Sequence, residues 1–214
     1  MESLKTKRKI NKNLFAIIIG LVIIVIGNSV LIYNYCSTKK MEKIEEESIE
    51  AFFEESITED EEHQIEEEPK EQEKTKEVNI DYIGVLEIPK ISLKKGLVDK
   101  NSYYNNVNRN IYILKETTFP DESEVSHIIL ASHSGNSSVS YFRNLNKLSL
   151  NDEVYFYYEN IKYVYKIINR YEIEKTGKMN LKLTNKSDIT LVTCISHTNK
   201  QVVFVGKLIR TENY

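Results

Sequence analysis

Hydrophobic and polar positions divide the chain into three parts with different patterns. An apolar run of about 20 residues covers 14–33. A helix of that length spans the hydrocarbon core of a membrane, which is about 30 Å thick. Residues 36–79 have few apolar side chains and no strand pattern. From residue 80 onward, short apolar stretches alternate with turn residues, and this pattern predicts many short strands.

The third part is predicted to form seven or eight short strands with little helix. The expected strands cover 81–91, 111–114, 127–132, 153–158, 162–168, 171–175, 189–193 and 201–209. Pro89 interrupts the first of them, which indicates an edge or a bend. A short helix is expected over 139–147, because its apolar residues have helical spacing. Many short strands with little helix favour a closed or nearly closed β-barrel, so the predicted fold is mainly β.

The net charge of −3 hides a strong segregation of charge along the chain. Residues 1–41 carry +6, residues 42–77 carry −13 and residues 78–214 carry +4. The basic residues of 1–13 place the N-terminus in the cytoplasm and make 14–35 a transmembrane signal anchor. A cleaved signal peptide is the competing interpretation. The apolar run is long, however, and no small-x-small cleavage site follows it.

The acidic segment 36–79 cannot bury enough apolar surface to offset the entropy of ordering, so we expect a flexible stalk. Residues 80–214 then form one domain of ordinary size. The chain has two cysteines, Cys36 beside the apolar run and Cys194 in this domain, and we expect no disulfide between them. Such sparse cysteine usage fits an exported protein that does not rely on disulfides.

Several classes of function find no support in the sequence. The four histidines and two cysteines have no metal-ligand spacing, so we expect no metal site and no cofactor. The sequence has no phosphate-binding loop and no dinucleotide-binding fingerprint. The basic residues of 80–214 are dispersed, which gives no support for nucleic-acid binding.

Two of the apolar strands end in residues that suit nucleophilic catalysis. Residues 190–193 run into Cys194, and residues 128–132 run into His133. A thiol at a strand end is held by the sheet and can be reached from solvent, which suits a nucleophile. The alternative interpretation is that Cys194 is a small buried residue of the core. A free cysteine has a pKa of about 8.5. A nearby imidazole can accept that proton and later protonate a leaving amine. His127, at the other end of the same strand, is a poorer candidate.

These stretches resemble the sortases, the membrane-anchored cysteine transpeptidases of Gram-positive bacteria. Residues 190–194, Thr-Leu-Val-Thr-Cys, match the family's TLxTC signature, and residues 84–91 resemble its first strand, G-x-L-x-I-P-K-I. Residues 130–135, Leu-Ala-Ser-His-Ser-Gly, lie where the family has its catalytic histidine. Residues 142–154 resemble the stretch F-x-x-L…L-x-x-G-D-x-V, with asparagine in place of its glycine. The resemblance covers roughly 80–210 and implies an eight-stranded β-barrel.

The resemblance makes Cys194 the nucleophile and His133 the general acid and base. The residues around them are expected to contact the substrate. These candidates are Thr193, Ser132, Ser134 and His197. His197, three residues after the cysteine, is also a second and weaker candidate for acid–base chemistry.

The chain departs from the family where sortases carry an arginine at the start of the last strand. Gln201 occupies this position. A glutamine amide can still donate a hydrogen bond to an oxyanion, although it supplies no charge. Lys200 is the rival for this role, but strand alternation turns it to the opposite face from Gln201.

The resemblance implies a transpeptidase with its catalytic domain outside the cell. It would cleave an LPxTG-like sorting signal of a surface protein through a thioacyl-enzyme and transfer the acyl group to an amine on a peptidoglycan precursor or a pilin. A cysteine hydrolase and a catalytically degenerate binding module are the alternatives.

The sequence also bears on the subclass of sortase that the chain resembles. The short loop 174–188 argues against class B, and the missing Asp-Pro-aromatic lid motif argues against a pilin polymerase. A class A or class D-like enzyme remains, with calcium dependence left open.

Overall fold

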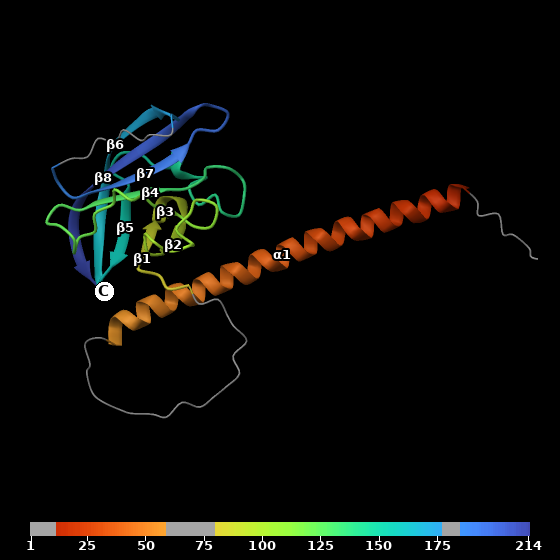
Figure 1. Cartoon of the computed structure of the whole chain (residues 1–214), viewed down its shortest axis with the longest axis horizontal. Helices are drawn as coiled ribbons and strands as arrows, with labels where there is room; N and C mark the ends of the chain where they lie inside the picture. The colour runs from red at the N-terminus through yellow and green to blue at the C-terminus, as the bar shows by residue number, and fades with distance from the viewer. Residues whose placement is uncertain (1–11, 59–79, 177–184) are drawn as a thin grey trace, which may run out of the picture. The chain divides into compact units, whose positions relative to one another are not determined.

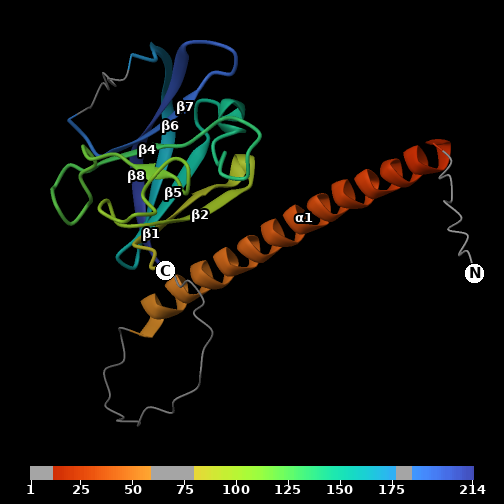
Figure 2. The same ribbon diagram turned by 45° about the vertical axis from the view of Figure 1, so that its right-hand side comes forward.

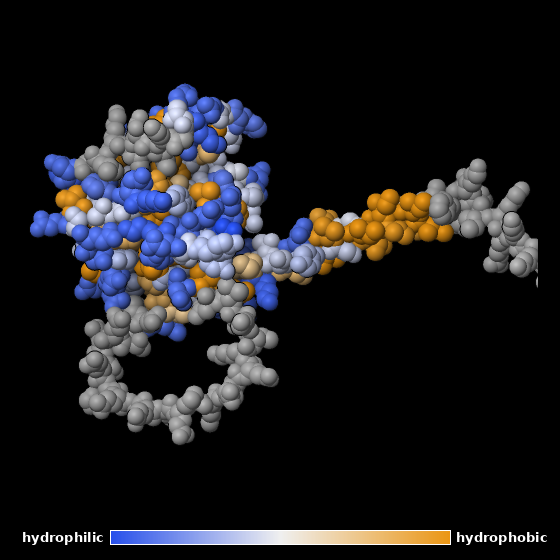
Figure 3. Space-filling view, in the orientation of Figure 1, coloured by the Kyte–Doolittle hydropathy of each residue, from blue (hydrophilic) through white to orange (hydrophobic). Residues whose placement is uncertain are grey.

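The computed structural model describes residues 12–58, 80–176 and 185–214, and the chain forms two units, Met1–Ile44 and Glu45–Tyr214 (Figure 1). Helix α1, Lys12–Thr58, begins in the first unit. Its large apolar side chains from Ile17 to Tyr35 are exposed, and Figure 3 shows a continuous apolar surface on this part of the helix. Of the helices in the described ranges, only α1 is long and apolar enough to cross a membrane. This is consistent with a single-pass anchor.

Helix α1 continues beyond the apolar run into the acidic segment and ends at Thr58. The part of the predicted stalk that the structure describes, 36–58, is therefore helical. The apolar residues Ile49, Phe52 and Phe53 in this part recur with partial helical spacing, which favours the continuation. Residues 59–79 of the predicted stalk lie outside the described residues.

Eight strands form one sheet in the order β2-β1-β5-β6-β8-β7-β4-β3. Their bounds are β1 Gly84–Ile88, β2 Leu93–Leu97, β3 Tyr112–Ile113, β4 His127–Ala131, β5 Glu153–Tyr158, β6 Ile161–Glu174, β7 Asp188–Cys194 and β8 Lys200–Asn213. Figures 1 and 2 show the sheet wrapping around on itself. The prediction of a nearly closed eight-stranded β-barrel is confirmed.

The barrel is filled by large apolar side chains that alternate along the strands. Along β7, Ile189 and Leu191 point into this core, and Phe204 of β8 packs with them. The other face of the same strands carries a smaller cluster that includes Val192 and Val203. Because successive side chains of a strand point to opposite faces, these two clusters indicate which face each side chain takes along β7 and along the part of β8 that pairs with it.

The helix predicted over 139–147 is wrong. The structure has turns there and one 3₁₀ turn, η2, Leu145–Lys147. Backbone hydrogen bonds in this stretch join residues three apart, as from Leu145 N to Phe142 O at 3.1 Å. Successive tight turns bury Phe142 and Leu145 as fully as a helix would. The apolar spacing therefore predicts correctly which side chains are buried, but it does not distinguish a helix from successive tight turns.

Other strand boundaries differ from the prediction in smaller ways. The segments expected at 162–168 and 171–175 form the single strand β6, which has a register shift between Ile167 and Asn169 instead of a break. Strand β2, Leu93–Leu97, pairs with β1. The interruption expected at Pro89 is a 3₁₀ turn, η1, Pro89–Ile91.

Asn151 has a φ of 75°, in the left-handed region. Sortases have glycine in the corresponding place of the motif, and glycine enters this region without steric cost. Asparagine is among the few other residues that visit this region routinely. The departure from the family's motif at this turn is therefore compatible with the same backbone.

Candidate active site

Strands β4 and β7 are parallel neighbours, and this pairing brings the two candidate catalytic residues together. Ala131, the last residue of β4, is in register with Val192 of β7. The ladder continues through the hydrogen bond from Ser132 N to Val192 O at 3.2 Å. His133 and Cys194 lie two residues beyond the registered pair, one on each strand. Neighbouring strands lie about 4.8 Å apart, so the two residues are at adjacent strand ends.

Alternation also places both side chains on the same face. Ala131 and Val192 belong to the smaller cluster outside the barrel core. Cys194, two residues further along β7, returns to that face, and we expect the same of His133, which follows the end of β4 by two residues. Both are partly exposed, in contrast to the buried strand residues that precede them. The arrangement holds a thiol and an imidazole on the sheet with access from solvent.

Gln201 lies directly across from the candidate nucleophile. Strands β7 and β8 are antiparallel, and Cys194 is in register with Gln201. Directly opposed residues point to the same face, with Cβ atoms about 4.5–5.5 Å apart. Strand β8 therefore brings the glutamine amide beside the thiol, at the position where the resemblance expects an arginine.

Lys200, the rival for this role, has a different environment. Its Nζ lies 3.3 Å from Glu172 Oε2 of β6 in an exposed ion pair. As the neighbour of Gln201 on β8, it points to the opposite face of the strand. The structure therefore places Gln201, and not Lys200, on the face of Cys194.

Two of the expected substrate-binding residues are buried and support the backbone. Thr193 is 4% exposed, and its hydroxyl donates a hydrogen bond of 2.8 Å to the carbonyl oxygen of Ser132. Ser132 is also 4% exposed, and its hydroxyl lies 3.5 Å from Val139 O. The first contact ties β7 to the end of β4 immediately before His133, and the second ties Ser132 to the turn at Val139. Both residues therefore help to position the backbone beside the candidate pair, and their contact with a substrate stays a prediction.

The other two expected substrate-binding residues lie nearer the solvent. Ser134 is partly buried and follows His133 directly. His197 is exposed and has a φ of 60° in the short turn between β7 and β8. Both flank the candidate pair, and their contact with a substrate stays a prediction.

The sequence analysis did not identify Asn108, which contacts the candidate histidine. Asn108 Oδ1 lies 3.1 Å from His133 Nε2. Asn108 belongs to the loop between β2 and β3, about 25 residues before His133 in the sequence. The one feature of the sequence that could have pointed to Asn108 is the high number of asparagines in 101–110. Without further information, such a stretch indicates turns and not a contact with a histidine.

His127, at the far end of β4 from His133, is paired with Asp188 of β7. Its Nδ1 lies 2.9 Å from Asp188 Oδ1, and the Asp188 side chain is 2% exposed. Since β4 runs from His127 to Ala131 and His133 follows its end, the strand separates the two histidines. The structure thus places His127 away from Cys194, as the sequence indicates.

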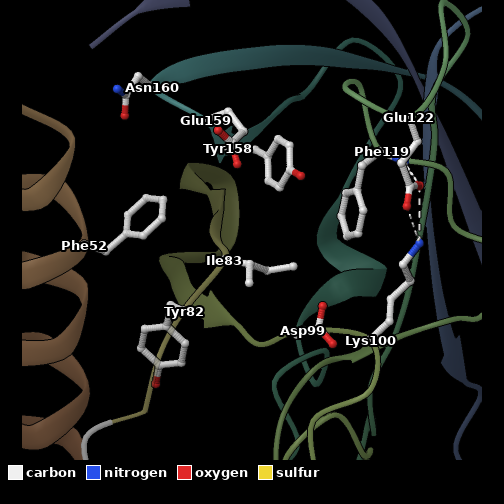
Figure 4. A pocket seen from close by; sticks show the side chains of 10 residues that line it. All are labelled: Phe52, Tyr82, Ile83, Asp99, Lys100, Phe119, Glu122, Tyr158, Glu159 and Asn160. Atoms are coloured by element: carbon white, nitrogen blue, oxygen red, sulfur yellow. Dashed lines mark hydrogen bonds and ion pairs between the residues drawn. The ribbon is translucent and has the colours of Figure 1, made fainter. Parts of the chain in front are cut away.

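A cavity of about 360 Å³ lies in the second unit (Figure 4). Figure 4 shows Phe119 and Tyr158 in its wall, with the Lys100–Glu122 ion pair beside them. The segment that carries Phe119 precedes β4, whereas His133 follows it. Among the described residues that line the cavity there is no thiol or imidazole, so it is separate from the candidate pair. Within the described ranges, no three His, Cys, Asp or Glu side chains form a potential metal site.

The comparisons with known proteins agree on one family. The model of the Sortase domain matches residues 86–209. Sortase A of Listeria monocytogenes is similar at 21% identity and a TM-score of 0.53, over 62% of this chain and 90% of that chain. Sortase C of Streptococcus pneumoniae, whose structure bears on pilin substrate specificity, has 20% identity and a TM-score of 0.54, over 62% and 71%. Sortase E1 of Streptomyces coelicolor, with a tripeptide in its active site, has 22% identity and a TM-score of 0.52, over 62% and 90%. A search of curated proteins found no match.

Proposed function

Since this chain belongs to the sortase family, whose members are cysteine transpeptidases, we propose that it is a transpeptidase in which Cys194 is the nucleophile and His133 the acid and base. One observation carries the proposal. The proposal is supported by the parallel register of β4 and β7, which ends at Ala131 and Val192, two residues before His133 and Cys194. A nucleophile and its base must lie within reach of each other for this chemistry.

The first half of the reaction forms a thioacyl-enzyme. The Cys194 thiolate attacks a carbonyl carbon of the sorting signal, and a carbon–sulfur bond forms. The carbon–nitrogen bond of the peptide then breaks, and the protonated His133 gives its proton to the leaving amine. The Gln201 amide, directly across from Cys194, donates a hydrogen bond to the oxyanion that develops between these steps.

The second half transfers the acyl group. An incoming amine attacks the thioester carbonyl, and His133 accepts the proton that this amine loses. The carbon–sulfur bond breaks and regenerates the thiolate and the imidazolium. An amine on a peptidoglycan precursor or on a pilin is the acceptor that we propose, and surface proteins with an LPxTG-like signal are the acyl donors. The neutral amide of Gln201 makes a catalytically degenerate module the second candidate.

The location follows from the first unit. Helix α1 anchors the chain in the membrane, and the basic residues before it keep the N-terminus in the cytoplasm. The catalytic barrel then lies outside the cell, where sorting signals and amine acceptors are found. No cofactor is part of the proposed reaction, and incubation with a calcium chelator tests this point.

The test is product analysis with the full-length protein in detergent. A peptide with an LPxTG-like signal and a small peptide amine are incubated with the protein, and the products are identified by mass spectrometry. A product that joins the two peptides is expected. A hydrolysed donor as the sole product would favour the hydrolase, and an unchanged donor would favour the degenerate module.

A further inference from the structure

One asparagine outside the strands contacts the candidate acid and base. Asn108 Oδ1 lies 3.1 Å from His133 Nε2. We propose that Asn108 is a positioning residue that orients the His133 imidazole and keeps a proton on Nε2. The inference rests on the proposed function, because it assigns a role within the same reaction.

The chemistry of the contact selects one tautomer. An amide oxygen only accepts hydrogen bonds, so the imidazole nitrogen that faces it carries a hydrogen and donates. In a neutral imidazole one nitrogen is protonated and the other has a lone pair. Protonation at Nε2 therefore leaves the lone pair on Nδ1. This nitrogen accepts the proton of the Cys194 thiol and gives it to the leaving amine in the first half of the reaction. In the second half it accepts the proton of the incoming amine.

The contact has to be rigid for this selection to work. Asn108 is exposed, and an exposed hydrogen bond orients a ring weakly on its own because water competes for both groups. The rest of the loop must therefore hold the asparagine in place. Two buried asparagines, Asn105 and Asn110, flank Asn108 at a distance of three and two residues.

Asn105 fastens one side of the loop to the barrel. Its Nδ2 donates to Lys100 O at 2.9 Å and to Ile113 O at 3.0 Å. Its Oδ1 accepts a hydrogen bond of 2.8 Å from Ile113 N. Both ends of the amide are thus engaged with backbone that includes a residue of β3. A buried amide with all these bonds formed has one stable orientation.

Asn110 fastens the other side. Its Nδ2 donates to Gly96 O of β2 at 3.0 Å, and its Oδ1 accepts from Ile111 N at 2.8 Å. Between the two anchors, Asn106 Oδ1 accepts a hydrogen bond of 2.9 Å from Asn108 N. The backbone at the contact is therefore fixed from both sides and from within the turn.

A second contact joins the loop to the segment that follows His133. The Tyr141 hydroxyl donates to Arg109 O at 3.4 Å, and Phe142 N donates to His133 O at 3.1 Å. Burial raises the pKa of Tyr141 to about 12, so the phenol keeps its proton and remains a donor at neutral pH. The Tyr141–Arg109 hydrogen bond thus gives the loop a second connection to the segment that carries His133.

The test compares Asn108→Ala and Asn108→Asp in the full-length protein. Asn108→Ala removes the acceptor, and we expect kcat to fall roughly 10- to 100-fold with little change in KM, as for the loss of a group that orients a catalytic side chain. Asn108→Asp restores an acceptor, so turnover should recover. Its carboxylate favours the imidazolium, so the pH limb of His133 should move to higher pH. Asn101→Ala, seven residues earlier in the same loop, is the matched control and should keep the wild-type rate and pH profile.

A spectroscopic measurement separates orientation from folding. Long-range ¹⁵N–¹H correlation spectra of histidine-labelled protein report which ring nitrogen of His133 carries the proton, with His133→Gln for assignment. We expect protonation at Nε2 in the wild type and a mixture in Asn108→Ala. Protonation at Nδ1 in the wild type, or an unchanged tautomer and rate in Asn108→Ala, would overturn the inference. If the wild type had no turnover, the proposed function would fail, while the tautomer would still decide the role of Asn108.

Discussion

Gln201 and Cys194 are in register across the antiparallel pair of β7 and β8, so the amide and the thiol share one face of the sheet. Sortases have a charged guanidinium where this chain has the amide. An oxyanion at the substrate carbonyl carbon, once bonded to the Cys194 sulfur, would form next to Gln201. The neutral side chain is therefore a departure from the family's motif directly beside the candidate nucleophile.

Replacing Gln201 tests this contact. Gln201→Ala should lower kcat about 10²- to 10³-fold, as expected for the loss of one oxyanion donor. Gln201→Arg should be tolerated or raise activity, because it adds charge assistance to the same contact. Steady-state kinetics on one accepted peptide measure both effects. Lys200→Ala is the control and should change little, since Lys200 is paired with Glu172. A larger effect of Lys200→Ala would assign the role to the lysine.

His133 should be the histidine on which turnover depends. His133→Ala is expected to lower kcat by about 10²- to 10⁴-fold, the usual contribution of general acid–base catalysis. His197, which is exposed in the turn after Cys194, serves as the comparison for His133. His197→Ala should affect KM more than kcat, if it has an effect at all. The opposite ranking of the two variants would show that the acid and base had been assigned to the wrong histidine.

His127 should affect stability and not chemistry. His127→Ala removes the partner of Asp188, whose side chain is 2% exposed. Leaving such a buried acceptor without this bond costs about 1–3 kcal/mol. Urea unfolding should show this loss in the free energy of unfolding, while the folded protein keeps its kcat. A normal stability with lost activity would mean that His127 acts in the reaction.

The anchor should hold the barrel on the outer side of the membrane. Protease added to intact, wall-stripped cells should release a soluble domain by cutting in the acidic segment before residue 80. Immunoblotting of the supernatant detects this fragment. A cytoplasmic protein of the same cells serves as the control for lysis. A barrel that becomes cleavable only after lysis would reverse the topology.

The sequence predicted the barrel and the strands that end at the candidate residues, because the patterns of these strands are local. The apolar run before Cys194 and that before His133 each define a buried strand from a few neighbouring residues. The Gln201 position could be aligned because β8 has a regular pattern up to Gly206. These local patterns can be recognised without knowing what the strands pack against.

The features that sequence analysis missed depend on contacts between distant segments. Apolar spacing over 139–147 could not separate a helix from successive tight turns, since both bury Phe142 and Leu145. The buried role of Thr193 depends on the Ser132 carbonyl of another strand. Asn108 meets His133 only through a loop held by buried asparagines. No local pattern in the sequence indicates that these distant residues contact each other.

The most direct test of the account is the intact mass of the protein during turnover. Full-length protein is mixed briefly with an LPxTG-like peptide, quenched in acid and mapped by peptide mass spectrometry, and the rest is chased with a peptide amine. We predict an acyl adduct on Cys194 that disappears in the chase as the joined product forms, and no adduct in Cys194→Ala. Joined product from Cys194→Ala, or an adduct on a different residue, would contradict the assignment of Cys194 as the nucleophile.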